Sequence, residues 1–217
     1  MAATSPATLV FLLSLICIPS RFLTGALPAP PPTVANPVTP PPATPSLAPA
    51  LPPAPWDEPG YPSKPVPEPV RKTCARTPFP NLCGRVLAYA VDPQRANDTR
   101  HLAEVATGAA IKAGTALAAF GYVHIAGAQN ATRLRLCVSD CTVHVGGAVK
   151  NLTAAAADLK QGERSEAVHL MGDAAKGLGV CFGSCAMFAG EAMVVMSKRA
   201  LQLEKLIMIA SSIIAII

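Results

Sequence analysis

Two pairs of cysteines, each spaced Cys-x-x-x-Cys, constrain the fold of this chain more than any other feature. Cys137 and Cys141 form the first pair, and Cys181 and Cys185 form the second. Both pairs lie in segments where apolar residues recur every three or four positions, as they do on one side of an α-helix. Cysteines four residues apart on a helix lie one turn apart on the same face. Each helix therefore presents two thiols to a neighbour.

The apolar residues of both segments alternate spacings of four and three without a miss, which predicts a packing seam along each helix. The seams consist of Leu134, Val138, Cys141, Val145, Ala148, Leu152, Ala155 and Leu159 in the first helix, and of Ala167, Met171, Ala174, Leu178, Cys181, Cys185 and Phe188 in the second. Between them, residues 160–165 contain Gly162 as a helix stop and Ser165 as the expected N-cap. This connection is short enough to make the two helices antiparallel neighbours.

In an antiparallel hairpin, residues at the same height have numbers with a constant sum. The residue numbers of Cys141 and Cys181 add up to 322, and so do those of Cys137 and Cys185. Half of 322 is 161, a position inside the expected turn. The four cysteines therefore face each other as two rungs of a ladder, which predicts the disulfides Cys141–Cys181 and Cys137–Cys185. A zinc site made by the four thiolates is the competing interpretation, and it is the weaker one if the chain is secreted.

The N-terminus indicates secretion. Residues 9–18 form a ten-residue apolar run broken only by Ser14, and small residues follow at positions 24–26. This pattern predicts a signal peptide over residues 1–26, because the run is too short to cross about 30 Å of hydrocarbon. Its removal discards Cys17 and leaves six cysteines, an even number that predicts disulfides and leaves Cys74 to pair with Cys83. Three sequons, which are glycosylated only in the secretory pathway, lie at Asn97, Asn130 and Asn151.

Residues 27–69 are mostly Pro, Ala, Val, Thr and Ser, and the chain contains 23 prolines. Proline fixes φ and removes an amide donor, so this segment is expected to be an extended, solvated stalk rather than a domain. Its Ala-Pro and Thr-Pro steps resemble cell-wall arabinogalactan and extensin-type sequences, whose prolines are hydroxylated and glycosylated. An unmodified disordered linker is the alternative.

The rest of the chain reads as helical. From Gly84 onward Pro93 is the only proline, and alanine-rich segments predict further helices over residues 101–128 and 191–209. Residues 70–217 are therefore expected to form an all-α domain, an up-and-down four-helix bundle preceded by a smaller element at residues 70–91.

The composition argues against several functions. The four histidines, His101, His124, His144 and His169, lie on different segments without ligand spacing, so no metal or cofactor is expected. The formal charge of +5 is scattered, with no basic patch interleaved with aromatic residues, so nucleic acid is not an expected partner. Because the chain contains no nucleophile elbow, phosphate loop or paired carboxylate motif, an enzyme is not expected either.

One segment carries a more specific signal. Residues 74–83 read Cys-Ala-Arg-Thr-Pro-Phe-Pro-Asn-Leu-Cys, and Cys141 follows Ser-Asp, with Cys181 forty residues later. These motifs resemble the plant invertase and pectin methylesterase inhibitor family, over about residues 70–205. The resemblance implies a helical hairpin that precedes the bundle and is closed by the bond between Cys74 and Cys83. The chain differs from the family pattern in its extra pair, Cys137 and Cys185, in a shorter connection after Cys185, and in Val145 where the family has an aromatic residue.

The resemblance implies a function without chemistry of its own: a secreted cell-wall protein that binds a wall enzyme and blocks its substrate cleft. Pectin methylesterase is the expected partner and acid invertase the alternative, because the chain lacks the Pro-Lys-Phe tripeptide of the invertase-inhibitor branch. By resemblance, the partner-binding candidates are Glu104, Lys112, Arg133, Arg135 and Asp140. Each of these residues could instead belong to a solvated helix face. A non-inhibitory, arabinogalactan-like structural wall glycoprotein is the remaining alternative for the whole chain.

The C-terminus raises one further question, because residues 206–217 are apolar apart from two serines. Together with the small residues 189–190 and the polar segment 197–205, they loosely match a lipid-anchor signal. Cleavage there would remove the fourth helix, with its expected seam of Met196, Ala200, Leu203 and Ile207. We therefore expect this helix to be retained, and a membrane is an expected partner only if the anchor signal is used.

Overall fold

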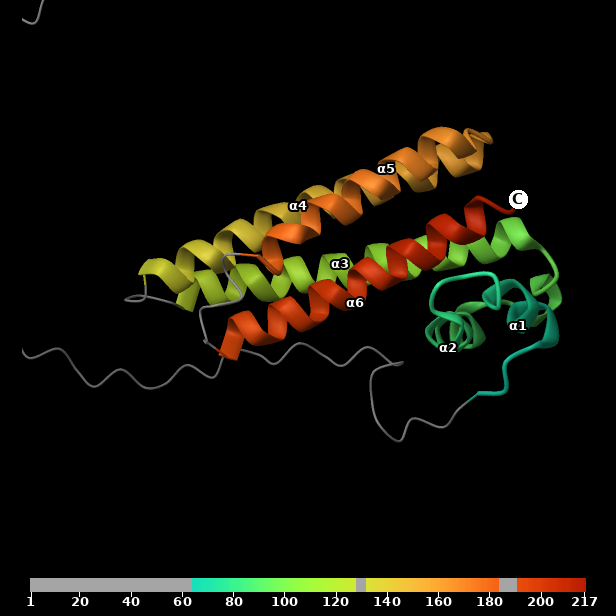
Figure 1. Cartoon of the computed structure of the whole chain (residues 1–217), viewed down its shortest axis with the longest axis horizontal. Coiled ribbons are helices and arrows are strands. Elements are labelled where there is room, and N and C mark those ends of the chain that lie inside the picture. Colours follow the sequence, from blue (N-terminus) through green and yellow to red (C-terminus); the bar gives the residue numbers. More distant parts are fainter. Residues whose placement is uncertain (1–63, 128–131, 184–190) are drawn as a thin grey trace, which may run out of the picture. The chain divides into compact units, whose positions relative to one another are not determined.

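The computed structural model describes residues 64–127, 132–183 and 191–217, which all belong to one compact unit. Every regular element in these ranges is helical, which confirms the all-α prediction (Figure 1). In chain order they are α1 (Glu68–Cys74), α2 (Pro80–Ala90), the 3₁₀ turn η1 (Pro93–Arg95), α3 (Thr99–Gly127), α4 (Thr132–Gln161), α5 (Arg164–Gly177), the 3₁₀ turn η2 (Leu178–Cys181) and α6 (Glu191–Ile214). The predicted signal peptide and most of the predicted stalk lie outside the described residues.

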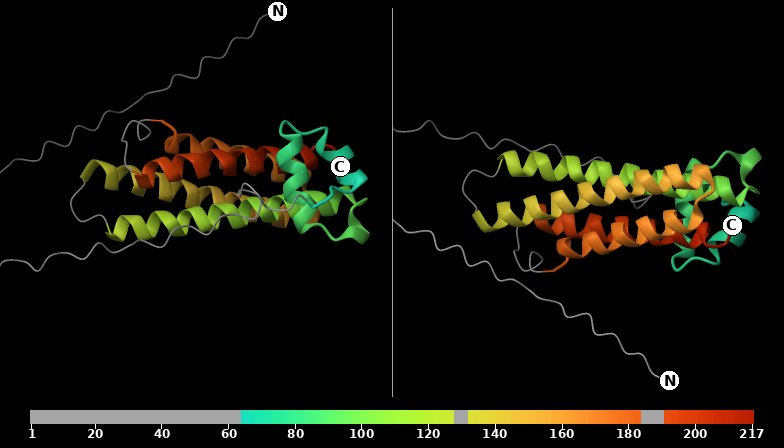
Figure 2. Two further views of the ribbon diagram at one scale, coloured as in Figure 1. Left: turned by 90° about the horizontal axis from the view of Figure 1, so that it is seen from below. Right: turned by 90° about the horizontal axis from the view of Figure 1, so that it is seen from above.

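Helices α3, α4, α5 and α6 lie side by side as the predicted up-and-down bundle (Figures 1 and 2). Helix α3 packs against α4 and α6, and α5 packs against the same two helices from the other side of the bundle. The connections from α3 to α4 and from α4 to α5 are short, so these neighbours run in opposite directions. The predicted four-helix bundle is thus confirmed.

Both predicted seams form the core of the bundle wherever the structure describes them. In α4 the seven positions from Val138 to Leu159 are at most 3 % exposed, and Leu134 is partly buried. In α5 and η2 the positions Ala167, Met171, Ala174, Leu178 and Cys181 are fully buried. Because residues three and four apart on a helix share one face, this burial pattern follows directly from the spacing in the sequence.

The second seam helix is shorter than predicted. Its α-helical part ends at Gly177, and the chain continues as the 3₁₀ turn η2 rather than as an α-helix through Cys185 and Phe188. Glycine is a poor helix former, and glycines at positions 177, 179 and 183 weaken the helix here. Cys185 and Phe188 themselves lie outside the described residues.

The turn between α4 and α5 differs from the prediction at its second half. Gly162 has a φ of +90°, the left-handed conformation that ends a helix. Its amide donates to the Leu159 carbonyl, and the Glu163 amide donates to the Asp158 carbonyl. These two bonds form a Schellman motif that ends α4, and α5 begins immediately afterwards at Arg164. Ser165 therefore lies inside α5, and the prediction that it is the N-cap is wrong.

The N-terminal hairpin consists of α1 and α2, and the Cys74–Cys83 disulfide joins them. Helix α1 begins at Glu68, two residues before the predicted boundary, because proline is tolerated in the first turn of a helix and Pro69 lies there. Val66, on the chain entering α1, lies against Gly84 of α2. Figure 2 shows α2 running across one end of the bundle.

Helix α6 extends to Ile214, five residues beyond the predicted end at residue 209. Its buried residues are Met193, Met196, Ala200, Leu203, Leu206, Ile207, Ile209, Ala210, Ile213 and Ile214. The predicted seam of this helix is therefore buried, and the apolar C-terminal run contributes to the same core. Among the described helices, none is both long and apolar enough to cross a membrane.

Candidate partner-binding surface

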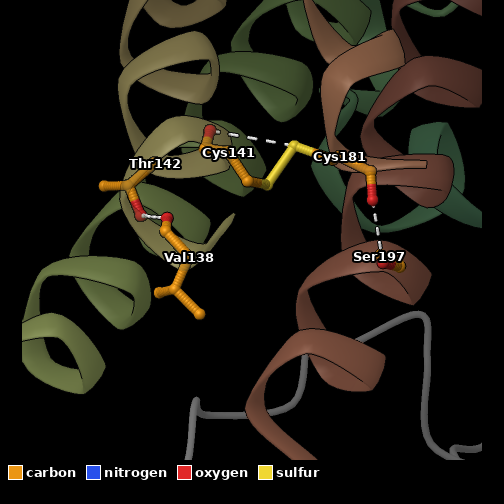
Figure 3. Close-up of a disulfide and its surroundings, with 5 residues drawn as sticks. All are labelled: Val138, Cys141, Thr142, Cys181 and Ser197. Atoms are coloured by element: carbon orange, nitrogen blue, oxygen red, sulfur yellow. Dashed lines mark hydrogen bonds between the residues drawn. A yellow bond between two sulfur atoms is a disulfide. The ribbon is translucent and has the colours of Figure 1, made fainter. Parts of the chain in front are cut away.

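A disulfide fixes one end of the bundle (Figure 3). Cys141 of α4 is bonded to Cys181 of η2, with their Cα atoms 4.8 Å apart. The Ser197 hydroxyl of α6 donates a hydrogen bond of 2.9 Å to the Cys181 carbonyl. The disulfide therefore joins α4 to η2, and the hydrogen bond joins η2 to α6.

The second rung of the predicted ladder is only partly visible. Cys137 is 8 % exposed and disulfide-bonded. Its predicted partner, Cys185, lies outside the described residues, so the pairing Cys137–Cys185 stays a prediction. The hairpin geometry that predicts it is the geometry that Cys141 and Cys181 adopt in the structure.

Helices α3 and α4 approach closely at two glycines. A Cβ atom at Gly121 would lie 2.0 Å from the Thr142 hydroxyl oxygen, and one at Gly114 would lie 2.7 Å from a Val149 methyl carbon. The Thr142 hydroxyl is itself held, because it donates a 2.6 Å hydrogen bond to the Val138 carbonyl (Figure 3). These contacts fix the height of α3 relative to α4.

One face of α4 points away from the core and carries apolar side chains. Arg133, Leu136, Asp140 and Val143 are three or four residues apart, so they share this face. Leu136 is 61 % exposed and Val143 is 64 % exposed, whereas Val138 and Cys141, next to them on the core side, are buried. An exposed carboxylate thus lies between two exposed aliphatic side chains.

Tyr122 of α3 extends this exposed apolar region. It is 60 % exposed and follows Gly121, while Val143 follows Thr142, the residue that Gly121 contacts. Because α3 and α4 are antiparallel, Tyr122 is level with Cys141, so Tyr122 and Val143 lie only about 3 Å apart along the bundle on two neighbouring helices. We call Tyr122, Leu136, Asp140 and Val143 the α3–α4 patch.

The structure separates the five partner-binding candidates of the sequence. Asp140 belongs to the α3–α4 patch, and Arg133 and Arg135 are exposed beside it in the first part of α4. Lys112 is exposed in the middle of α3. Glu104 lies near the start of α3 and is within ion-pair distance of Arg100 and His101 of its own helix, at 3.8 and 3.9 Å.

Glu104 does not belong to the same surface as the α4 candidates. Helices α3 and α4 are antiparallel, so the start of α3 and the start of α4 lie at opposite ends of the hairpin. At a rise of 1.5 Å per residue, Glu104 and Arg133 are more than about 30 Å apart along the bundle. One standard-sized interface centred on the patch reaches Arg133, Arg135 and Asp140, and it does not reach Glu104.

Sequence reasoning missed Tyr122, Leu136 and Val143. A signal was present for the two α4 residues, because large apolar side chains lie there two positions away from the seam residues Val138 and Val145. Such a position points to solvent when the seam faces the core. The sequence gives no comparable sign that Tyr122 belongs to this patch. Its place there follows only from the contact between Gly121 and Thr142.

An N-cap fixes the start of α3. The Asp98 carboxylate accepts a 3.1 Å hydrogen bond from the His101 amide and a 2.9 Å hydrogen bond from the Arg95 guanidinium. The Arg95 bond, followed by the His101 bond, lowers the pKa of Asp98 below its usual value of 3.8. These bonds orient the chain as it enters the bundle from η1.

The sequons and the histidines add little to the site. Asn97 is exposed in the turn before α3, Asn151 is half-buried on α4, and Asn130 lies outside the described residues. Among the residues that the structure describes, no group of three or more His, Cys, Asp or Glu side chains could hold a metal ion.

Comparison with known proteins gives one finding and one absence. The sequence model of the family described as plant invertase/pectin methylesterase inhibitor matches residues 68–213. No curated protein matches the chain. The match begins at the first residue of α1 and ends one residue before the last residue of α6, so it includes all of the described helices except that last residue. The chain therefore belongs to the plant invertase/pectin methylesterase inhibitor family.

Proposed function

We propose that this protein is a secreted inhibitor that binds pectin methylesterase and occludes its substrate cleft. Family membership supports an inhibitor of pectin methylesterase or invertase in general. The narrower proposal rests on the absence from the sequence of the Pro-Lys-Phe tripeptide of the invertase-inhibitor branch. Acid invertase is the alternative target.

The observation that carries this proposal is the α3–α4 patch. Leu136 and Val143 are more than 60 % exposed although both are large and apolar, and Tyr122 beside them is equally exposed. Exposed apolar side chains that cluster with an aromatic residue are typical of protein–protein interfaces. The patch lies on two helices held by the close contact of Gly121 with Thr142 and by the Cys141–Cys181 bond. Such a rigid surface loses little conformational entropy when it binds.

The wall location is part of the same proposal. The apolar run at residues 9–18, the proline-rich segment 27–69 and the sequon at the exposed Asn97 support secretion and a position in the cell wall. Two disulfides in the described domain fit an oxidising compartment. The protein would act there by binding alone.

Titration of the full mature chain against purified pectin methylesterase and acid invertase, in parallel, tests the proposal. We expect inhibition of the esterase that is relieved by excess pectin, and no inhibition of the invertase. Inhibition of the invertase alone would reassign the target. Inhibition of neither enzyme at mildly acidic to neutral pH would favour the structural wall glycoprotein.

A pair of variants tests the surface. Leu136→Asp places a charge in the apolar part of the α3–α4 patch, and we expect it to weaken esterase inhibition by about tenfold or more, as for an interface hot spot. Val194→Asp is the matched control, because Val194 is also 61 % exposed but lies on α6. If Leu136→Asp inhibits the esterase as strongly as Val194→Asp does, the enzyme-binding surface lies elsewhere.

A further inference from the structure

A groove between the hairpin and the bundle carries a concentration of positive charge. It has a volume of about 610 Å³ and lies between the start of α2 and the outer face of α6. Its walls include Phe79, Arg85, Lys198, Leu201, Gln202 and Lys205. None of the ten described residues that line it is acidic.

The groove continues in both directions. Lys198 and Gln202 also line a hollow of about 240 Å³ further along α6, which adds Arg199. Arg85 also lines a hollow of about 440 Å³ on the hairpin, which adds Arg71, and no acidic residue lines either hollow. Arg71 is paired with Glu68, which offsets its charge. We call the surface formed by Phe79, Arg85, Lys198, Leu201 and Lys205 the cationic groove.

The spacing of the charges indicates the shape of the ligand. Lys198 and Lys205 are seven residues apart on α6, about 10 Å along one face of the helix. Arg85 lies on α2, on the other wall of the groove. A small anion could reach one of these cations, whereas a linear molecule with repeated negative charges could contact all three. Arginine binds carboxylates through two parallel hydrogen bonds, and lysine adds point charges.

The uncharged side chains of the groove indicate which groups the ligand would carry between its negative charges. Leu201 is 44 % exposed, and Phe79 lies beside it with its ring 5.7 Å from the Lys205 ammonium. These side chains offer an apolar surface for the C–H face of a sugar ring, and the Asn81 amide on the same wall can donate to and accept from hydroxyl groups. Amide, aromatic and cationic groups in one open groove suit a charged sugar polymer.

We infer that the cationic groove binds a linear polysaccharide that carries carboxylate groups, that is, a polymer of uronic acids. This site is formed by α2 and α6, whereas the α3–α4 patch is formed by two other helices. The inference does not depend on the proposed enzyme target. It would give the protein its own attachment to an acidic wall polymer.

Direct binding of oligogalacturonate to the full chain, measured by calorimetry without any enzyme, tests this inference. We expect binding at low ionic strength that is lost at about 0.5 M salt, where the Debye length falls to a few ångströms. The variant K198Q/K205Q should bind roughly tenfold more weakly, as expected for the loss of two exposed ion pairs that act together. The variant K150Q/K160Q removes the same charge from exposed positions on α4 and should bind within about twofold of the unmodified protein.

Three outcomes would overturn the assignment. Equal weakening in both double variants would show that net charge, not the groove, attracts the polymer. Equal binding of fully methyl-esterified pectin would show that the carboxylates are not recognised. Equal binding of polyglutamate, with the same sensitivity to K198Q/K205Q, would assign the groove to an acidic protein partner instead.

The single variant K198Q is measured as well, because Lys205 contacts Phe79 and its replacement could disturb folding. If K198Q/K205Q folds poorly, K198Q alone still tests the groove.

Discussion

Gly121 of α3 lies against Thr142 of α4 so closely that a Cβ atom on residue 121 would be 2.0 Å from the threonine hydroxyl oxygen. Thr142 is fully buried and its hydroxyl is bonded to the Val138 carbonyl, so it has little freedom to move aside. This contact sets the spacing of α3 and α4 beneath the α3–α4 patch. Here only glycine allows the two helices to approach as they do.

The substitution Gly121→Ala should therefore destabilise the domain by about 1–3 kcal/mol, the usual cost of overpacking a core. Gly108→Ala is the matched control in the same helix, since a Cβ atom there would meet nothing within 4 Å. That substitution should stabilise the domain by about 0.5–1 kcal/mol, because alanine loses less backbone entropy in a helix. Chemical denaturation of both variants measures the two effects, and a neutral Gly121→Ala would contradict the close packing.

The two disulfides that the structure describes should differ in their contribution to stability. Cys141–Cys181 spans 40 residues and Cys74–Cys83 spans 9. The predicted Cys137–Cys185 bond would keep the same loop closed, so the comparison is made in a C137S/C185S background. There C141S/C181S should cost about 4 kcal/mol and C74S/C83S about 3 kcal/mol, because closing a longer loop loses more entropy. Thermal unfolding of both variants measures the difference, and a larger loss from C74S/C83S would contradict the chain-entropy account.

Peptide mapping of the unreduced, unmodified protein tests the predicted disulfide between Cys137 and Cys185, the second rung of the ladder. We expect a peptide pair that joins Cys137 to Cys185. Detection of Cys185 as a free thiol, or in a bond to another cysteine, would show that the hairpin geometry does not extend one turn beyond Cys141 and Cys181.

The bundle could be predicted from the sequence because its apolar residues recur at regular helical spacing. The seams of α4 and α5 are set by residue spacing alone, and a constant sum of cysteine positions gives the antiparallel register. The α-helical end at Gly177 and the start of α5 at Arg164 were mispredicted. Both depend on local hydrogen bonding at glycines, where several turn geometries compete and the sequence does not choose among them.

The candidate surfaces were harder to derive than the fold. Asp140 was found through its place beside Cys141, but its exposed neighbours Leu136 and Val143 were not, because apolar residues are ordinarily assigned to the core. Glu104 was grouped with Arg133 by the family resemblance, and the antiparallel arrangement of α3 and α4 separates them. The cationic groove joins residues more than 100 positions apart, Arg85 and Lys198, and such a pairing exists only in the folded chain.

The N-cap of α3 should make stability depend on pH. The bonds from Arg95 and His101 lower the pKa of Asp98 in the folded protein, so folding is favoured by the ionised carboxylate. This stabilisation is fully present above the unfolded pKa and is lost as pH falls through the lower folded pKa. Asp98→Ala should therefore lower Tm at pH 7, and its difference from the unmodified protein should shrink below about pH 3.8.

The Asp98→Ala experiment leaves the neighbouring glycosylation sequon intact and has a matched control variant. The sequon at Asn97 survives Asp98→Ala, since any residue except proline is tolerated at its middle position. Asp173→Ala removes the same charge from an exposed position where only ion pairs with His169 and Lys176 are lost, and it should change Tm little at any pH. A constant Tm difference for Asp98→Ala from pH 3 to pH 7 would show that Asp98 acts without its charge.

The C-terminal helix should be retained in the mature protein. Helix α6 buries ten side chains, of which eight are Met, Leu or Ile. Burial of each large apolar side chain contributes about 1.5–3 kcal/mol, so removal of α6 would cost on the order of 10–20 kcal/mol. A domain of this size is stable by only about 5–15 kcal/mol, and processing near residue 189 for a lipid anchor would unfold it. Intact-mass analysis of protein from its native source should therefore find residues 206–214 present, whereas a lipid-modified end before Glu191 would show that the remaining helices fold without α6.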